Sequence, residues 1–407
     1  MKKTRLVHVI TRFDKGGSAE NTFLTLAGLD QEAYEILLVM GLSHESEMGP
    51  QERVSVEGNL SRLRERGIRI EVLPELLRRL SPFYDVMAFV ALWRLFRRER
   101  PEIVHTHTSK AGLLGRWAAW LAGVPLIVHT PHGHVFWGYF GPAKTRLFVL
   151  LERLSALLTD RLVMLTKQEG IDHIRFGIAA AEKFTTIHSG IDLGRFSARG
   201  PDGIETRKEL GIPEEAFVVG SVGRLTAIKG HCVLIEAARK VIARHKNTVF
   251  VFLGAGELLE ELRRQASEGG IANHVRFTGW QSDVGRIMST YDLCAFPSLN
   301  EGMGRAIVEA MSMGIPIIAS RIGGITDLMD DGVSGFLVPP ADPEALADRI
   351  VYLMQHPERG RRMAKKALET VAEYGSGAMV RKIEDVYSDL LSRKVNRGVL
   401  ACRPAKP

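Results

Sequence analysis

Apolar positions recur along this chain with two different periods. Short runs rich in β-branched and aromatic residues predict strands, and longer segments with apolar residues at helical spacing predict helices between them. The expected strands are 6–10, 36–40, 68–73, 103–105, 126–129, 162–165, 184–187, 218–222, 249–253, 275–277, 293–296, 315–319 and 335–338. The expected helices include 86–98, 113–122, 146–158, 232–243 and 344–353. Because strand–helix alternation is typical of parallel sheets covered on both faces, the pattern predicts an α/β protein.

The strand–helix pattern restarts after Gly200, which predicts two doubly wound domains. The segment 190–211 between the two series is polar and glycine-bearing, so we expect a linker near 197–202. The predicted parts are a first domain at 1–197, a second at 198–375, a C-terminal helix at 376–395 that packs back towards the first domain, and a basic, disordered tail at 396–407. Two such domains are expected to bind a ligand in the cleft that faces the carboxyl ends of their strands.

Composition narrows the class of partner. The 407 residues are 45% hydrophobic, which is ordinary for a soluble globular protein, and the formal net charge is +7. A basic balance indicates nucleic acid, a membrane surface or an anionic substrate. No nucleic-acid motif accompanies the charge, so a nucleic-acid partner ranks lowest. The three cysteines are scattered, without metal-like spacing, which fits a reducing cytoplasm.

Membrane contact is expected to be peripheral if it occurs. We find no signal-peptide pattern and no apolar run of the roughly 18–20 residues that a spanning helix needs. The amphipathic segments 76–100 and 144–158 mix basic and large apolar residues. They read either as core helices with a solvated basic face or as a surface that docks on an anionic membrane.

The segment after the predicted strand 293–296 carries two glutamates, Glu301 and Glu309, with a glycine-interrupted loop and a helix-forming run between them. If the helix begins at Gly302, a rise of about 1.5 Å per residue puts the carboxylates roughly 12 Å apart along its axis. That is about the span from sugar to ribose in a sugar nucleotide. The N–H groups of the helix start would lie between them, where a diphosphate can bind. The alternative is a strand–loop–helix unit with two solvated carboxylates.

Two cations and a glycine-rich turn follow other strands of the second series. Arg224 and Lys229 are five residues apart in one loop, and a diphosphate suits one guanidinium and one ammonium. Gly254 and Gly256 form a turn after the next strand. Taken alone, Arg224 and Lys229 fit equally well as exposed loop cations. The Gly254–Gly256 segment alone fits a tight βα turn.

The first series ends its strands with glycines and histidines. Gly16 and Gly17 precede a helical run, where backbone N–H groups can approach an anion, but they do not form the G-x-G-x-x-G pattern of dinucleotide binding. Taken alone, this glycine pair favours a tight βα turn over an anion site. Histidines cluster in 105–110 and 129–134, where they suit acid/base chemistry, hydrogen bonding or metal ligation. No carboxylate or thiolate lies close in sequence and no Asp-x-Asp occurs, so no metal is expected. His132, between a proline and a glycine, stands out from the others.

These motifs together resemble a retaining family 4 glycosyltransferase of the GT-B type, similar to bacterial surface-polysaccharide members. The resemblance runs from residue 6 to about residue 391. It rests on Gly16-Gly17, His105-x-His107 with Lys110, Thr130-Pro131-His132-Gly133, Ser189-Gly190-Ile191-Asp192 with Phe196, Gly223-Arg224-Leu225 with Lys229-Gly230, Gly254-x-Gly256, Pro297-Ser298, Glu301-Gly302-x-Gly304 with Glu309-Ala310-Met311, Gly323-Gly324, and the run Asp331 to Val338. The ordered set of motifs is highly specific for the family, although no single motif in the set is specific by itself. Met303 departs from the aromatic residue that the family often has there, and His188-Ser189 departs from its usual Pro-Asn.

The resemblance implies a role for each candidate residue. Glu309 would hold the ribose, Glu301 the donor sugar, and His132 would lie beside that sugar. The full donor-binding set would be Gly16, Gly17, Arg224, Lys229, Gly254, Gly256, Glu301, Gly302, Met303, Gly304 and Glu309. Catalysis would involve His132, Glu301, Arg224 and Lys229, where the two cations neutralise the diphosphate leaving group. His107 and Lys110 are the acceptor-side candidates.

The implied reaction is metal-independent transfer of a hexosyl or N-acetylhexosaminyl group, with retained configuration. The donor would be a nucleotide-sugar, UDP-linked on family frequency, and no cofactor or metal is expected. The acceptor would be a hydroxyl of a lipid-linked or polysaccharide acceptor in cell-surface glycan synthesis. We expect a cytoplasmic protein with peripheral contact to an anionic membrane.

Two other functions fit part of the pattern. A non-hydrolysing sugar-nucleotide 2-epimerase has a related two-domain shape, but it does not explain the ordered set of two cations and two glutamates. A non-catalytic nucleotide-sugar-binding subunit is the other, and the presence of His132 and Glu301 argues against it. An assay without acceptor separates the epimerase, and absence of turnover identifies the binding subunit.

Overall fold

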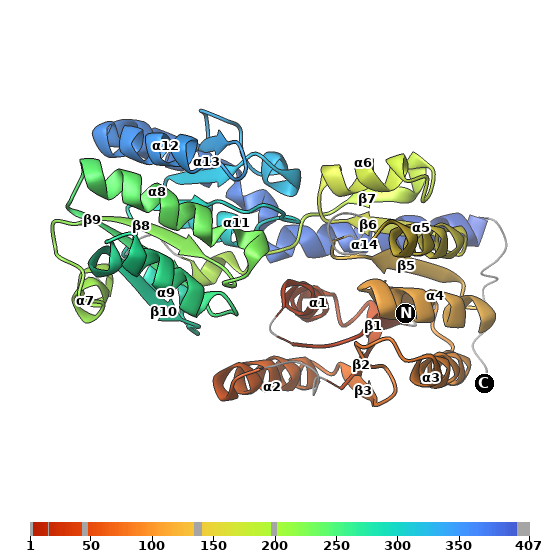
Figure 1. The fold of residues 1–407 in the computed structure, drawn as a ribbon. Helices are drawn as coiled ribbons and strands as arrows, with labels where there is room; N and C mark the ends of the chain where they lie inside the picture. Colours follow the sequence, from red (N-terminus) through yellow and green to blue (C-terminus); the bar gives the residue numbers. More distant parts are fainter. Residues whose placement is uncertain (1–2, 15, 43–47, 134–140, 197–201, 397–407) are drawn as a thin grey trace. The chain divides into compact units, whose positions relative to one another are not determined.

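The computed structural model describes residues 3–14, 16–42, 48–133, 141–196 and 202–396, so the predicted linker residues 197–201 and the tail from 397 lie outside the described residues. The chain forms two compact units (Figure 1). The first comprises Met1–Gly190 with Ser376–Pro407, and the second comprises Ile191–Gly375. The division follows Gly190 rather than residue 197, because Ile191 and Phe196 are buried in a core of the second unit.

A parallel seven-stranded sheet in the order β3-β2-β1-β4-β5-β6-β7 forms the centre of the first unit. Its strands are β1 (Thr4–Ile10), β2 (Tyr34–Gly41), β3 (Arg69–Leu73), β4 (Ile103–His107), β5 (Leu126–Thr130), β6 (Arg161–Met164) and β7 (Phe184–Thr186). Its helices are α1 (Gly17–Gly28), α2 (Pro50–Glu65), α3 (Pro82–Glu99), α4 (Ser109–Leu121), α5 (Pro142–Leu157), α6 (Lys167–Arg175) and α14 (Ser376–Asn396).

Alternate side chains of the strands build a core on each face of this sheet. Leu6 and Ile10 of β1 pack in one core with α1, α2 and α14, whereas Val7 and Val9 pack in the opposite core with α3 and α4. This alternation follows from the two-residue period of a strand, and apolar residues on both faces are what a doubly covered parallel sheet requires.

The second unit has a parallel six-stranded sheet in the order β10-β9-β8-β11-β12-β13. Its strands are β8 (Phe217–Val222), β9 (Thr248–Leu253), β10 (Val275–Gly279), β11 (Leu293–Phe296), β12 (Ile317–Ser320) and β13 (Phe336–Val338). Its helices are α7 (Asp202–Glu209), α8 (His231–Arg244), α9 (Leu259–Glu268), α10 (Val284–Met288), α11 (Arg305–Ser312), α12 (Pro343–Gln355) and α13 (Pro357–Thr370). Helices α8, α9 and α12 cover one face and α10 and α11 cover the other, while α13 contributes residues to both cores.

The structure therefore confirms the predicted α/β class and two doubly wound sheets. One local prediction was wrong: α11 begins at Arg305, not at Gly302. Gly304 has a left-handed backbone with φ of 75°, so the regular helix cannot extend through it. Among the described helices, none is long and apolar enough to cross a lipid bilayer.

Candidate functional site

Candidate residues of the second unit gather at one edge of its sheet. Arg224 follows β8, Gly254 follows β9, and the loop 297–304 follows β11. These strands are parallel neighbours, so their carboxyl ends meet at the same edge. The glycine turns predicted separately from the sequence are thus brought together on one face of one unit.

A salt bridge joins two of the predicted donor-binding residues. The Lys229 ammonium pairs with Glu301 Oε2, and Ser298 Oγ lies 3.3 Å from the same carboxylate oxygen. Both ionic side chains are mostly buried, with 26% and 17% of their surfaces exposed. The Arg224 side chain, in contrast, is exposed. Lys229 and Glu301 therefore position each other, and Arg224 is the more accessible cation of this loop.

Backbone contacts hold the same two loops together. The amide of Leu299 donates to the Ile228 carbonyl at 2.8 Å. Gly230 has φ of 66°, and a Cβ there would lie 2.0 Å from the Pro297 carbonyl oxygen. Real Cβ atoms essentially never come that close, so Gly230 is required by the contact between the loops.

Gly254 and Gly256 have a structural reason of their own. A Cβ on Gly254 would lie 2.0 Å from the Gly223 carbonyl oxygen, and one on Gly256 would lie 2.5 Å from that of Leu225. The Leu225 amide donates to the Ala255 carbonyl at 3.0 Å. These glycines let the loop after β9 pack on the loop that carries Arg224, whether or not they also contact a ligand.

The two glutamates lie on different local structures. Glu301 is in the loop before α11, and Glu309 is a half-buried residue inside that helix. Between them, the Met303 side chain is 3% exposed and packs in a core of the second unit. Met303 therefore has only its backbone to offer a ligand.

In the first unit, Gly16 caps helix α1 and Gly17 is its exposed first residue. The Gly16 amide donates to Asp14 Oδ1 at 2.9 Å, and Arg12 pairs with Asp14 at 3.1 Å. The carboxylate that already occupies this helix start would repel a second anion. A diphosphate contact at Gly16 would require Asp14 to move aside.

His107 and His132 belong to a larger hydrogen-bonded set, which we call the histidine chain. In order of contact it comprises His132, His107, His8, Tyr387, His105 and Thr130. Its successive contacts between ring nitrogens and oxygens measure 2.9, 2.9, 3.2, 2.6 and 2.8 Å. The histidine chain starts at His132, just after β5, passes through β4, β1 and α14, and ends at Thr130, the last residue of β5.

Burial keeps the imidazoles of this chain neutral. It lowers the pKa of His8 to about 3 and holds the pKa values of His105 and His107 well below their usual range. Burial also raises the pKa of the Tyr387 phenol well above its ordinary value. The rings of His8, His105 and His107 are therefore uncharged at neutral pH, and the phenol keeps its proton.

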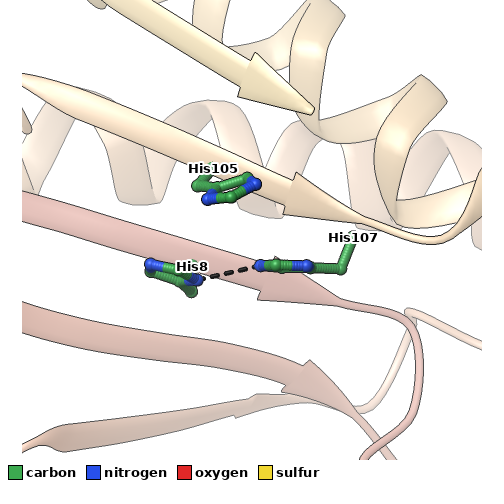
Figure 2. Close-up of side chains that lie close together, drawn as sticks. All are labelled: His8, His105 and His107. Carbon is green, nitrogen blue, oxygen red and sulfur yellow. Dashed lines mark hydrogen bonds between the residues drawn. The ribbon is translucent and has the colours of Figure 1, made fainter. Parts of the chain in front are cut away.

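The rings of His8, His105 and His107 also satisfy the spacing of a metal site (Figure 2). One nitrogen from each lies within 4.8 Å of the others. All six nitrogens of these rings, however, already have hydrogen-bond partners within the histidine chain. Among the residues that the structure describes, no carboxylate or thiolate joins the three rings to balance a divalent charge. We interpret the cluster as a hydrogen-bonded network.

A cavity of about 450 Å³ lies in the first unit beside these residues. Lys110 lines it and is paired with Asp85 in this structure, while Leu113, Phe148 and Leu151 give it an apolar wall. His132 is not among its lining residues, but its neighbours Pro131 and Gly133 are. The cavity therefore combines an apolar surface with charged groups, as a site for an amphiphilic molecule requires.

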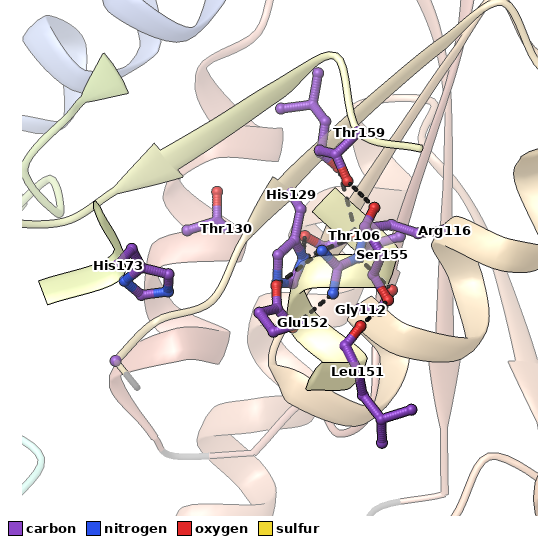
Figure 3. Close-up of polar contacts among 12 residues, drawn as sticks. Thr106, Gly112, Arg116, His129, Thr130, Leu151, Glu152, Ser155, Thr159 and His173 are labelled. Carbon is purple, nitrogen blue, oxygen red and sulfur yellow. Dashed lines mark hydrogen bonds and ion pairs between the residues drawn. The ribbon is translucent and has the colours of Figure 1, made fainter. Parts of the chain in front are cut away.

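A buried ion pair lies at one wall of that cavity, to which its carboxylate residue, Glu152, contributes (Figure 3). Arg116 is fully buried and donates to both carboxylate oxygens of Glu152 at 2.8 Å. Burial alone would raise the pKa of Glu152, but the Arg116 guanidinium lowers it below its usual value. His129 Nδ1 lies 2.9 Å from Thr106 Oγ1 and 3.1 Å from the Thr106 carbonyl, and its Nε2 lies 3.9 Å from Glu152.

Glu169 supports the backbone next to His132. Its carboxylate accepts hydrogen bonds from the Gly133 amide at 3.0 Å and the Leu165 amide at 2.8 Å. Burial raises the pKa of Glu169 to about 7, although both amides oppose that rise. His132 itself has φ of 60°, an uncommon left-handed backbone for a histidine. The carboxylate helps to hold that conformation.

Comparison with known proteins assigns the chain. Residues 16–190 match the family model of the glycosyl transferase 4-like domain, and residues 202–370 match that of glycosyl transferases group 1. The chain is 31% identical over 359 residues to the UDP-Gal:alpha-D-GlcNAc-diphosphoundecaprenol alpha-1,3-galactosyltransferase of Escherichia coli, covering 86% of this chain and 93% of the relative. The chain belongs to the family 4 glycosyltransferases.

Other relatives agree with this assignment. The glycosyltransferase is 33% identical over 310 residues to D-inositol 3-phosphate glycosyltransferase 2 of Catenulispora acidiphila, with 70% of each chain covered. The crystal structure of Anabaena HepE with UDP matches at a TM-score of 0.79 and 21% identity, covering 95% of this chain and 100% of that one. The fold is thus GT-B. The enzyme transfers a sugar from a nucleotide-sugar donor, which disfavours the epimerase and the non-catalytic subunit.

The structure divides the predicted site of the glycosyltransferase into two groups. The second unit brings together Arg224, Lys229, Gly254, Gly256, Glu301, Gly302, Met303, Gly304 and Glu309. The first unit carries Gly16, Gly17, His107, Lys110 and His132. The roles implied for these residues stay predictions.

Sequence reasoning missed several partners of these residues. It did not single out His8, Tyr387 or Glu169. His8 had a usable signal, because it is a histidine inside an otherwise apolar buried strand, in register with His105 of the neighbouring strand. Tyr387 and Glu169 gave no comparable signal, since their importance depends on contacts between distant segments.

Proposed function

We propose that this glycosyltransferase moves a hexosyl or N-acetylhexosaminyl group from a UDP-sugar to a hydroxyl of a lipid-linked acceptor, in cell-surface polysaccharide synthesis. The similarity to the Escherichia coli galactosyltransferase, whose name specifies a UDP-sugar donor and a diphosphoundecaprenol acceptor, supports both substrate classes. Solved structures of HepE with UDP and UDP-glucose support the donor. The observation that carries the proposal is the extent of the first similarity, which spans both units.

In the proposed donor site, Glu309 binds the ribose and Glu301 binds hydroxyls of the sugar. Glu301 meets the sugar while paired with Lys229, so that the diphosphate approaches a cation already held in place. Arg224, on the same loop and exposed, adds the second positive charge. Both cations stabilise the diphosphate as the glycosidic bond breaks, because negative charge develops on the leaving group.

We also propose that transfer retains the anomeric configuration and needs no metal. The donor set of cations and backbone amides supplies the positive charge that a divalent ion would otherwise give to the leaving group. The coupling constant of the anomeric proton in the NMR spectrum of the product reads the stereochemistry. Full activity after treatment with a chelator is the result expected for metal independence, and activity restored only by added Mg²⁺ or Mn²⁺ would reject it.

Donor binding is tested by replacing Glu309. Glu309→Ala should abolish measurable UDP binding in isothermal titration calorimetry, because the ribose loses its carboxylate acceptor, while the far-ultraviolet circular dichroism spectrum stays unchanged. The control is Glu260→Ala, which removes an exposed glutamate from helix α9 of the same unit. Equal UDP affinity in the wild type and the Glu309 variant would reject the assignment.

The acceptor is expected in the first unit. The cavity lined by Lys110, Leu113 and Phe148 offers apolar walls for the lipid-proximal part of the acceptor and charged groups for its polar part. His107 is fully occupied by the histidine chain. Of the two acceptor-side candidates, Lys110 is therefore the one that remains in the proposal as a direct contact.

Contact with the membrane that carries such an acceptor has a specific candidate surface. Leu147, Leu150, Leu154 and Leu157 recur at helical spacing on α5 and are 55%, 51%, 41% and 75% exposed. We call them the α5 leucine stripe. Exposed leucines on one helix face favour peripheral docking over the alternative of a core helix with a solvated basic face. Co-sedimentation with anionic vesicles is the measurement that tests this docking.

A further inference from the structure

The hydrogen bonds of the histidine chain permit only two arrangements of its protons. A neutral imidazole has one N–H donor and one nitrogen acceptor, so a ring that donates on one side must accept on the other. His8 and His107 face each other at 2.9 Å through His8 Nδ1 and His107 Nε2, and His107 Nδ1 faces His132 Nε2 at 2.9 Å. If one ring of this trio changes its tautomer, the other two must change with it.

Tyr387 extends the constraint to His105. The phenol has one proton, so it donates to one of its two histidine neighbours and accepts from the other. If the phenol donates to His105, then His8 donates from Nε2 and His105 donates from Nε2 to Thr130. If the phenol donates to His8, every direction reverses. In both arrangements, all four rings carry their proton on the same type of nitrogen.

The distances select one arrangement. The phenol oxygen lies 2.6 Å from His105 Nδ1 but 3.2 Å from His8 Nε2. Hydroxyl donors make shorter hydrogen bonds than N–H donors, so the short contact is the one in which Tyr387 donates. His8 then donates to the phenol oxygen through its Nε2 proton. All four rings are consequently Nε2–H tautomers.

We propose that the histidine chain is a positioning device that locks His132 as an Nε2–H tautomer, whose Nδ1 can only accept a hydrogen bond. This inference rests on the proposed function and on the place beside the donor sugar that the family resemblance implies for His132. An acceptor nitrogen there recognises a sugar hydroxyl, which can donate, and repels a phosphate oxygen, which cannot. The chain thus helps to place the sugar, rather than the diphosphate, against His132. Tyr387 and His8 are positioning residues, because they act through His132.

The first test reads the tautomers directly and needs no substrate. In the full-length protein labelled with ¹⁵N-histidine, long-range proton–nitrogen correlation spectra distinguish the protonated from the bare ring nitrogen. Single replacements of each histidine assign the signals. We expect His8, His105, His107 and His132 to be neutral Nε2–H tautomers. Opposite tautomers within the set, or a charged ring, would overturn the proposal, as would one bound zinc per chain in mass spectrometry of the native protein.

The second test removes the phenol hydroxyl. In Tyr387→Phe, His8 loses the phenol oxygen that accepts its Nε2 proton, so nothing fixes the direction of the hydrogen bonds among His8, His107 and His132. Both tautomers of His132 then become accessible. We expect an averaged nitrogen signal for His132 and a kcat lowered by about tenfold, with UDP affinity unchanged because UDP lacks the sugar. The control is Tyr34→Phe, which removes a hydroxyl from a ring that packs edge-on against Tyr387 at 5.9 Å. An unchanged kcat in Tyr387→Phe, or an equal loss in the control, would overturn the positioning role.

These two tests separate the inference from the function on which it rests. Mixed tautomers in an active UDP-sugar transferase would reject the histidine chain as a positioning device and leave the proposed function intact. Uniform Nε2–H tautomers in a protein that binds no UDP-sugar would reject the proposed function. They would also reject the role of the histidine chain in donor recognition.

Discussion

The contact between the Lys229 loop and the loop after β11 predicts a large effect of Gly230→Ala. Gly230 is left-handed, with φ of 66°, and an added Cβ would lie 2.0 Å from the Pro297 carbonyl oxygen. A left-handed backbone costs an L-residue about 1–2 kcal/mol. Relieving the overlap displaces a buried backbone segment, and such overpacking costs about 1–3 kcal/mol more. The expected loss of unfolding free energy is therefore about 2–5 kcal/mol.

Gly314→Ala is the matched control for this substitution. Gly314 lies in the same unit, just after α11, with a similar φ of 62°, but no atom lies within 4 Å of an added Cβ. Only the backbone term of about 1–2 kcal/mol applies to it. The difference between the two variants isolates the contact between the loops.

Urea unfolding followed by circular dichroism measures the loss in each variant. Hydrogen exchange of peptides covering 226–232 and 297–304 then shows whether the two loops separate. We also expect Gly230→Ala to bind UDP more weakly than Gly314→Ala, because displacement of the loop moves Glu301 away from Lys229. Equal unfolding free energies for the two variants, with equal protection of both peptides, would refute this reasoning.

Two further predictions concern the first unit. Because Glu169 has a pKa of about 7 when folded and 4.5 as its reference value, the stability that it contributes is fully present below pH 4.5 and is lost as the pH rises through 7, by about 3 kcal/mol in total. Urea unfolding across this range should therefore show a wild-type advantage over Glu169→Gln that shrinks as pH rises, and a constant difference would contradict the raised pKa. On the α5 leucine stripe, Leu150→Ser with Leu157→Ser removes apolar surface worth about 2 kcal/mol, so affinity for anionic vesicles should fall roughly 30-fold. Ile204→Ser, a 60% exposed isoleucine of the second unit, should leave vesicle binding unchanged, and equal binding of all three proteins would exclude the stripe as the docking surface.

Local patterns predicted the strands well because each strand is a short apolar run that depends on its own residues. The β11 strand matches its predicted bounds, Leu293–Phe296, and β12 starts two residues later than predicted, at Ile317. The start of α11 was wrong because helix propensity does not reveal the left-handed backbone at Gly304. Boundaries of this kind depend on turn geometry, which the apolar period does not encode.

The candidate site was predictable only in part, for a similar reason. The motifs placed Arg224, Lys229 and Glu301 at one sheet edge, but not the salt bridge between the last two. They singled out His132, but not the histidine chain behind it, which requires His8 and Tyr387 from segments 379 residues apart. Side-chain partners over such separations are set by the packing of helix α14 on the first sheet, which no local pattern specifies.

The place of α14 also has a consequence for the order in which this protein folds. Helix α14 completes a core whose other buried residues come from the first 190 positions, and it contributes Met379, Val380, Ile383, Val386, Tyr387 and Leu390. The second unit, in contrast, is one continuous segment. During synthesis, residues 191–375 are all present before α14 leaves the ribosome. The first unit to emerge is therefore the last that can be completed, and its apolar face stays uncovered while the second unit is made.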